Sequence, residues 1–121
     1  MAVPITGRIR SQQTFQALRR PAGRARSGVV RAAFVPPEAT DKSAFPLVAY
    51  TIGKRCGTAV QRNRIRRRLR AAVAVAAPDL VAGSYVLGAD PAAAAVPFVE
   101  LAGAASQAMR EAARLGSGGR S

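Results

Sequence analysis

The side chains best suited to a chemical role in this sequence are the basic ones, and they are unevenly distributed. Nineteen lysine and arginine residues against six aspartate and glutamate residues give the 121-residue chain a formal net charge of +13. Residues 54–70 hold eight basic residues and residues 1–37 hold seven, and neither stretch contains an acid. Because guanidinium groups match phosphate oxygens in shape and charge, these two basic blocks predict a polyanionic partner.

The same composition excludes several kinds of catalytic site. The chain has no histidine, which removes Ser-His-Asp and Cys-His nucleophiles and every histidine-containing metal site. The lone Cys56 allows neither an internal disulfide nor a paired-cysteine zinc site, and it is interpreted as a small turn residue. The six acids are scattered, whereas nucleases hold magnesium with clustered carboxylates. We therefore expect no catalytic residue and no metal site, and a chain that binds rather than cleaves.

Length and hydropathy indicate one domain without a membrane segment. The length fits a single compact domain, predicted over residues 1–115. No apolar run reaches the ~20 residues that a membrane-spanning helix needs. Residues 1–30 contain no apolar segment typical of a signal peptide. These features favour a cytoplasmic location.

A helix over residues 58–77 is expected to carry most of the second basic block. Thr58 and Gln61 have the spacing of a capping box, in which each side chain bonds a free backbone N–H at the helix start. At about 100° per residue, one face collects an apolar stripe that consists of Ile65, Leu69, Ala72, Val73 and Ala76. The arginines cover the opposite face and both flanks, except that Arg62 projects toward the stripe. Like charges four residues apart repel and destabilise the helix, and a bound anion would offset that destabilisation.

The remaining pattern places the other elements around this helix. A short helix is expected over residues 12–20 and strands over 28–35, 47–52 and 84–89. A last helix is expected over 97–115, with Gly116 as its C-cap and an apolar face of Phe98, Leu101, Ala105, Ala108, Met109 and Ala112. Residues 1–10 are predicted to be a flexible basic arm and residues 116–121 a disordered tail. The strand, helix and strand from 47 to 89 are compatible with a parallel crossover.

Three interpretations of the basic helix differ in the partner they require. A merely solvated basic face is disfavoured, because solubility does not require that acids be absent over 17 residues. Membrane binding is disfavoured, because the apolar stripe contains no Trp or Phe to enter lipid. Nucleic-acid binding is favoured, and the pattern alone leaves open the DNA major groove or an RNA whose bases stack on nearby aromatic rings.

A sequence motif narrows this choice. Residues 57–70 read Gly-Thr-Ala-Val-Gln-Arg-Asn-Arg-Ile-Arg-Arg-Arg-Leu-Arg. They closely resemble the signature of the bacterial ribonuclease P protein family, a Gly-x-Ala-Val-x-Arg-Asn-Arg helix followed by basic residues and preceded by a strand and a basic turn. Here the strand is 47–52 and the turn contains Lys54 and Arg55. The resemblance extends over about residues 8–115.

The resemblance implies a fold and a division of labour. The fold is α/β (α+β), a small domain with a mixed sheet of about four strands and three helices in the order α-β-β-β-α-β-α, with a left-handed crossover around the Arg-Asn-Arg helix. The implied partners are the catalytic ribonuclease P RNA and precursor tRNA, whose 5′ leader is removed. The RNA carries the chemistry with magnesium ions that it mainly binds itself. Neither membrane nor DNA is expected as a partner.

The resemblance also assigns roles to residues of this chain. Contacts to the catalytic RNA are expected from Lys54, Arg55, Arg62, Asn63, Arg64, Arg66, Arg67, Arg68 and Arg70. The single-stranded leader is expected in a cleft between the sheet and the first helix, lined by Phe15, Phe34, Arg8 and Arg10.

For two aromatic residues and one acid, the sequence also bears on whether they lie in the core or contact RNA. Phe34 shares a strand face with Val30 and Ala32, so a role in the core is equally compatible with the pattern. Tyr50 is expected in the core. Asp90 stands near a position that is often basic in the family, which argues against an RNA contact there. The main alternative function is a non-catalytic RNA-binding module, such as a ribosomal-protein-like factor.

Overall fold

The computed structural model describes residues 7–9, 12–37 and 45–117. Its helices and strands are, in chain order, β1 (Gly7–Arg8), α1 (Gln12–Ala17), β2 (Gly23–Ser27), β3 (Val30–Val35), β4 (Pro46–Thr51), α2 (Ala59–Ala76), β5 (Gly83–Ala89) and α3 (Phe98–Ser117). Short 3-10 turns lie at Lys54–Cys56 (η2), Ala77–Asp79 (η3) and Pro91–Ala94 (η4). The order of three helices and four strands that the family resemblance implies is confirmed, although the residue pattern located only three of those strands, and β1 adds a fifth, two-residue strand.

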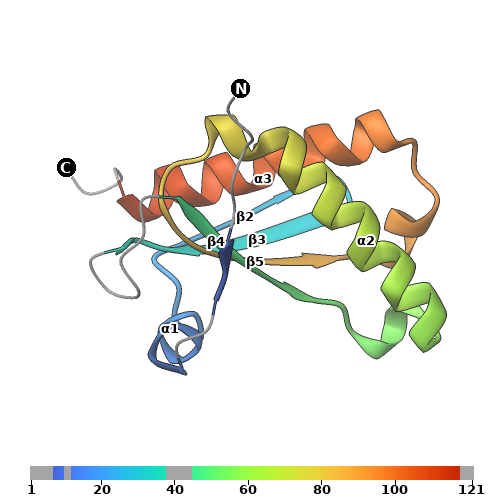
Figure 1. Cartoon of the computed structure of the whole chain (residues 1–121), viewed down its shortest axis with the longest axis horizontal. Coiled ribbons are helices and arrows are strands. Elements are labelled where there is room, and N and C mark those ends of the chain that lie inside the picture. The colour runs from blue at the N-terminus through green and yellow to red at the C-terminus, as the bar shows by residue number, and fades with distance from the viewer. Residues whose placement is uncertain (1–6, 10–11, 38–44, 118–121) are drawn as a thin grey trace.

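The strands form one mixed sheet in the order β1-β4-β5-β3-β2. β4 pairs in parallel with β1 and with β5, whereas β3 pairs antiparallel with β5 and β2. Because β4 and β5 are parallel neighbours, α2 is the crossover connection between them. α2 and α3 pack against each other and lie on one side of the sheet, with α1 apart from them (Figure 1).

The core lies between the sheet and these two helices. The stripe predicted on α2 is confirmed, since all five of its residues are buried. On α3, Leu101, Ala105, Ala108, Met109 and Ala112 are fully buried. Phe98, predicted on the same face, is 41% exposed because it is the first residue of the helix and lies at its end.

The N-terminal half differs from the prediction in three strands, β1, β2 and β3. β2 was not predicted, because its sequence Gly-Arg-Ala-Arg-Ser has no run of large apolar residues. Gly28, with φ of +56°, lies in the turn from β2 to β3, so the strand predicted at 28–35 begins at Val30. Gly7 and Arg8, predicted within a flexible arm, pair with β4, and Ile9 is buried. Residues 1–6 and 10 of that arm lie outside the described residues.

The prediction that Gly116 caps α3 is wrong, because the helix continues to Ser117. A Cβ at Gly116 would lie 2.8 Å from the Phe34 ring and 3.0 Å from the Gly23 amide nitrogen. Glycine is therefore required here by the close approach of α3 to β2. The predicted tail thus begins inside the helix, and residues 118–121 lie outside the described residues. The first helix is also shorter than predicted and ends at Ala17.

This close approach predicts opposite effects for one substitution at two places on α3. Gly116→Ala should destabilise the fold by about 1–3 kcal/mol, because the new methyl group overlaps Phe34 and the Gly23 backbone. Gly103→Ala is the matched control, since a Cβ there meets nothing within 4 Å. That control should stabilise the helix by about 0.5–1 kcal/mol. Urea unfolding measures both, and stabilisation by both substitutions would contradict the packing.

Candidate nucleic-acid interface

The start of α2 is fixed by a reciprocal pair of hydrogen bonds. The Gln61 amide donates to Thr58 Oγ1 at 3.2 Å, and the Thr58 amide donates to Gln61 Oε1 at 2.7 Å. Gly57 precedes this pair with φ of +114°, and a Cβ there would lie 2.0 Å from Gln61 Oε1. The predicted capping box is confirmed, and it determines which way the following arginines face.

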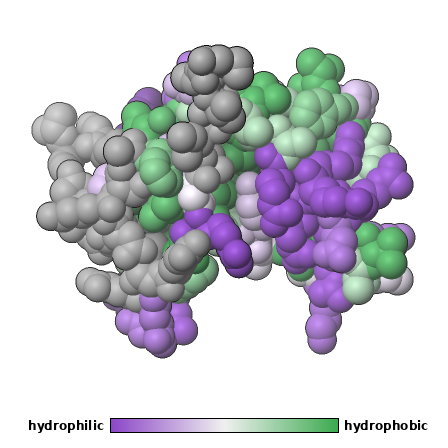
Figure 2. Space-filling view, viewed as in Figure 1, coloured by the Kyte–Doolittle hydropathy of each residue, from purple (hydrophilic) through white to green (hydrophobic). Residues whose placement is uncertain are grey.

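The outer surface of α2 presents a set of cations without counter-charge. We call it the α2 basic face, and it consists of the cations Arg64, Arg66, Arg67 and Arg70 together with the neutral Asn63. Figure 2 shows hydrophilic side chains gathered over α2. Among the described residues, no carboxylate forms a salt bridge with any arginine of α2. Like charges this close favour an external anion such as a phosphate chain.

Within this face, one side chain positions another. Arg66 Nη1 donates to Asn63 Oδ1 at 2.8 Å, one turn earlier.

Arg62 is half-buried, as its projection toward the apolar stripe predicted. Its Nε is buried and has no hydrogen-bond partner within the described part of the chain.

Arg68 has a partner that the sequence did not indicate. Its Nη1 and Nη2 donate to the backbone carbonyls of Ala93 and Val96. These carbonyls lie in η4 and in the segment that leads to α3, so Arg68 joins three elements. Its predicted contact to RNA stays a prediction, whereas its role inside the fold is visible.

A groove of about 610 Å³ runs beside α2 where α1, β1 and β4 meet it. Phe15 of α1 is 46% exposed and lines it together with Arg8, Tyr50, Arg66 and Arg70. Arg70 lies over the Tyr50 ring, with 5.5 Å from Cζ to the ring centroid. Burial raises the pKa of Tyr50, although the charge of Arg70 opposes this, so the phenol is neutral near pH 7. Phe15 and Arg8, predicted for the leader, thus lie beside arginines predicted for the catalytic RNA.

Tyr50 is a candidate that sequence reasoning missed. The alternation of β4 placed it with Val48 and Ile52 and predicted the core. Both neighbours are buried, whereas Tyr50 is half-buried at the rim of the groove. The signal that was available is the pairing of an aromatic ring with the Arg-rich helix that follows it.

Phe34 is not a cleft residue, and that prediction is wrong. Its side chain is 1% exposed and its ring packs on Tyr85, with 5.0 Å between centroids. A ring that α3 and the sheet enclose cannot stack on a base. Arg10, the other predicted cleft residue, lies outside the described residues.

The basic turn before α2 is anchored at its end. Lys54 and Arg55 in η2 are exposed, and Cys56 is buried. The Cys56 thiol donates to the Ala89 carbonyl of β5 at 3.4 Å. This contact fits the interpretation of Cys56 as a small turn residue and holds the two basic side chains beside the end of β5.

The sheet face opposite α2 and α3 carries a second basic surface that was not assigned. Arg24 and Arg26 of β2 are two residues apart and project to the same side. With Arg31, Thr51 and neighbouring small residues they line a hollow of about 490 Å³. We call this the open sheet face. The signal in the sequence was the alternation of arginines in Arg24-Ala25-Arg26.

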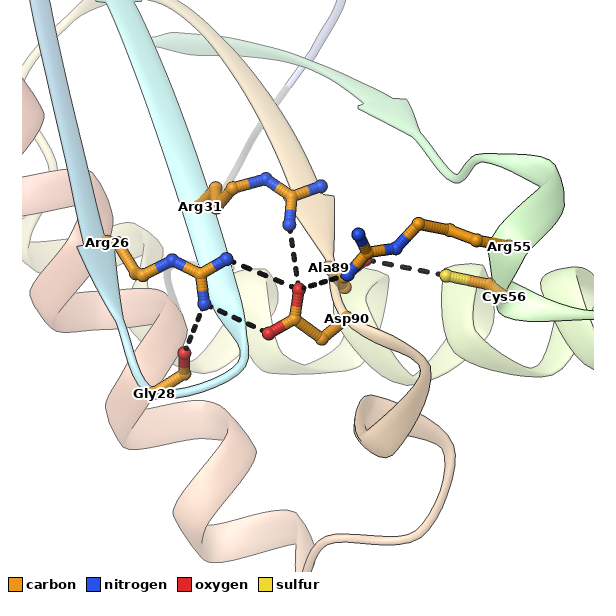
Figure 3. A network of polar contacts seen from close by, with 7 residues as sticks. All are labelled: Arg26, Gly28, Arg31, Arg55, Cys56, Ala89 and Asp90. Atoms are coloured by element: carbon orange, nitrogen blue, oxygen red, sulfur yellow. Dashed lines mark hydrogen bonds and ion pairs between the residues drawn. The ribbon is translucent and has the colours of Figure 1, made fainter.

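One acid lies at the end of this open sheet face. Asp90 pairs with Arg26, Arg31 and Arg55, which come from β2, β3 and η2 (Figure 3). The hydrogen bond from Arg26 lowers the pKa of the Asp90 carboxyl, and the charges of the three arginines lower it further. The carboxylate therefore stays ionised and paired at every pH near neutrality.

No group of three or more His, Cys, Asp or Glu side chains among the described residues is placed to hold a metal ion. In the same residues, no helix has the length and hydropathy to span a membrane.

Comparison with known proteins agrees with this geometry. The family model for ribonuclease P matches residues 3–113. The chain is 39% identical over 101 residues to the ribonuclease P protein component of Acidothermus cellulolyticus, covering 83% of this chain and 82% of the relative. It is 36% identical over 112 residues to that of Thermobifida fusca, covering 88% and 76%.

Solved structures share the fold at low identity. The RNase P protein of Thermotoga maritima superposes with a TM-score of 0.71 at 13% identity, over 85% of this chain and 94% of that one. The RNase P protein of Staphylococcus aureus gives 0.66 at 18% identity, over 84% and 90%. The mixed sheet with three helices is therefore a known arrangement.

Arg67 and Arg68 are adjacent on α2, and replacing each in turn distinguishes a structural role from a contribution of charge alone. Arg68→Ala should cost about 1–3 kcal/mol of unfolding free energy, because two carbonyls lose their donors. Arg67→Ala removes the same charge from an exposed side chain and should change stability by less than about 0.5 kcal/mol. Thermal unfolding of both variants measures the difference. Equal losses would mean that Arg68 does not hold η4 against α2.

Proposed function

This chain belongs to the ribonuclease P protein family, and from that premise we propose which of its surfaces serve the enzyme's two RNA molecules. It is the protein subunit of ribonuclease P, a ribonucleoprotein endoribonuclease of tRNA processing, and the ribonuclease P RNA is its partner.

The α2 basic face is proposed to bind the ribonuclease P RNA. The observation that carries this proposal is a row of arginines with no carboxylate among the described residues to pair with them. Arg64, Arg67 and Arg70 are exposed and can each give a forked contact to phosphate oxygens. Lys54 extends the same surface beyond the start of the helix, whereas Arg55 is paired with Asp90 at the corner of the open sheet face. Arg62, Asn63, Arg66 and Arg68 complete the set carried over from the family.

The 5′ leader of precursor tRNA is proposed to bind in the groove beside α1. Phe15 offers an exposed ring on which an unpaired base can stack, and Arg8 offers a phosphate contact next to it. Tyr50 joins Phe15 in this role in place of the buried Phe34. The leader continues, in this proposal, over the open sheet face with its three arginines.

Chemistry at the scissile bond belongs to the RNA in this proposal. Magnesium ions bound mainly by that RNA supply the activation of water. The side chains of this protein bind and orient the two RNA molecules and lower the electrostatic cost of bringing them together. We further propose a cytoplasmic location and no role in binding DNA.

Reconstitution tests the first assignment. The protein should stimulate cleavage of precursor tRNA by the ribonuclease P RNA at moderate magnesium and should do little alone. Arg64→Ala should weaken affinity for that RNA roughly tenfold, the size of a lost charge-assisted contact. Arg110→Ala removes an exposed charge from α3 and should have a small effect. Equal losses from both variants would show that only net charge matters.

Leader-dependent binding tests the second assignment. Phe15→Ala should weaken binding of leader-bearing precursor tRNA roughly tenfold, because one stacked base loses its platform. Binding of mature tRNA should change little. Phe98→Ala, which removes an exposed ring from α3, should affect neither substrate. A Phe15→Ala effect of the same size on both substrates would remove Phe15 from the leader path.

A further inference from the structure

A single carboxylate gathers three arginines at one corner of the open sheet face (Figure 3). Asp90 Oδ1 accepts from Arg31 Nη1 at 2.9 Å and from Arg55 Nη2 at 3.0 Å. Arg26 makes a forked contact, at 2.9 Å to Oδ2 and 3.3 Å to Oδ1. The cluster keeps two positive charges after pairing, since three guanidinium groups meet one carboxylate.

The carboxylate is the most covered member of this cluster. The Asp90 side chain is 24% exposed, against 43% for Arg31 and 67% for Arg55. A guanidinium group has five N–H donors. The contacts to Asp90 use one donor of Arg31 and one of Arg55. Asp90 thus holds these two side chains and leaves four of the five donors of each guanidinium outside its contact with the carboxylate.

A second, independent feature fixes the place of Arg31. Arg31 lies opposite Gly88 of β5 in the strand register, and Gly88 lies opposite Thr51 of β4. A Cβ at Gly88 would lie 2.8 Å from Arg31 Nη2, and the three atoms nearest to it all belong to Arg31. The missing side chain therefore leaves the space in which the Arg31 guanidinium lies across the sheet.

The site borders a hollow of suitable size for one nucleotide. Arg26, Arg31, Thr51 and Gly88 line the hollow of about 490 Å³ on this face. Pockets of this size hold small ligands, which suits a nucleotide of a single strand and not a duplex. Arg55 connects the same corner to the basic turn before α2.

We propose that Asp90 is a positioning residue that holds Arg31 and Arg55 as a preformed pair for one phosphodiester group of the single-stranded leader. The inference rests on the proposed leader path and adds to it a specific phosphate subsite and the residue that organises it. An arginine that is already ordered loses less side-chain entropy when it binds phosphate. Asp90 would so strengthen RNA binding although its own charge repels RNA.

Asp90→Asn should change RNA binding in opposite directions depending on whether Asp90 acts through net charge or through positioning. If Asp90 only reduces the net charge, Asp90→Asn removes one negative charge, raises the net charge by one and should tighten RNA binding. If it positions Arg31 and Arg55, the same substitution should weaken binding of leader-bearing precursor tRNA. We expect a five- to tenfold rise in KM for the reconstituted holoenzyme, about the effect of one lost charge-assisted contact. kcat, affinity for the ribonuclease P RNA and the holoenzyme's affinity for mature tRNA should stay within about twofold of wild type.

Two further variants separate positioning from charge. Gly88→Ala keeps every charge and displaces the Arg31 guanidinium, so it should raise KM for the leader-bearing substrate in the same direction. Asp79→Asn removes an exposed carboxylate of η3, outside the cluster, and is the control for net charge. It should leave KM unchanged or lower it slightly.

The outcomes distinguish this inference from the proposed function. Tighter binding with both Asp90→Asn and Asp79→Asn would overturn it, because net charge would then explain both. Equally weakened binding of precursor tRNA and mature tRNA, with a lowered Tm, would also overturn it and leave Asp90 a structural role. If Asp90→Asn does not fold, Gly88→Ala with unchanged KM overturns it. Failure of the proposed function itself would appear as no stimulation by the wild-type protein.

Discussion

Burial of a narrow apolar stripe holds α2 in place against the repulsion of its own arginines. Ile65 and Leu69 are fully buried and Val73 nearly so, and each such side chain contributes about 1.5–3 kcal/mol. Each like-charge pair on a helix costs only about 0.2–0.5 kcal/mol. The stripe therefore outweighs the repulsion, and the helix can present an arginine-rich face without internal carboxylates. Both surfaces that we propose to bind RNA, the α2 basic face and the groove beside α1, depend on this, since α2 carries the first and borders the second.

Arginines in this chain have two different functions that composition cannot separate. Arg68 uses its donors on backbone carbonyls, and Arg26 uses two of its donors on Asp90 and one on Gly28. Arg64 and Arg67 extend into solvent. The net charge of +13 therefore overstates the number of cations available to a partner. What matters for recognition is which guanidinium groups are held in place and which remain free to adjust.

The sequence predicted correctly those elements that are determined by residues close together in the chain. The α2 stripe and its capping box follow from helical periodicity and a four-residue motif, so both could be read from the sequence. β2 could not, because small residues and arginines form a strand here only through pairing with β3 and packing of α3. Phe34 was ambiguous for the same reason, since the covering helix lies some 70 residues away in sequence. The left-handed crossover came from the family resemblance alone, because general experience favours the opposite hand.

Because both long helices lie on one side of the sheet, the other side, the open sheet face, is left uncovered by them. β5 lies in the middle of the sheet, and the side chains that it turns toward α2 and α3 are buried, as Tyr85 and Leu87 show. Its other side carries Val86 and Gly88, which are too small to cover the neighbouring arginines. A larger residue at position 88 would fill the space that Arg31 occupies. The small residues of the central strand thus leave the open sheet face uncovered. Asp90 connects this face to the turn before α2, because it pairs with Arg55 of that turn.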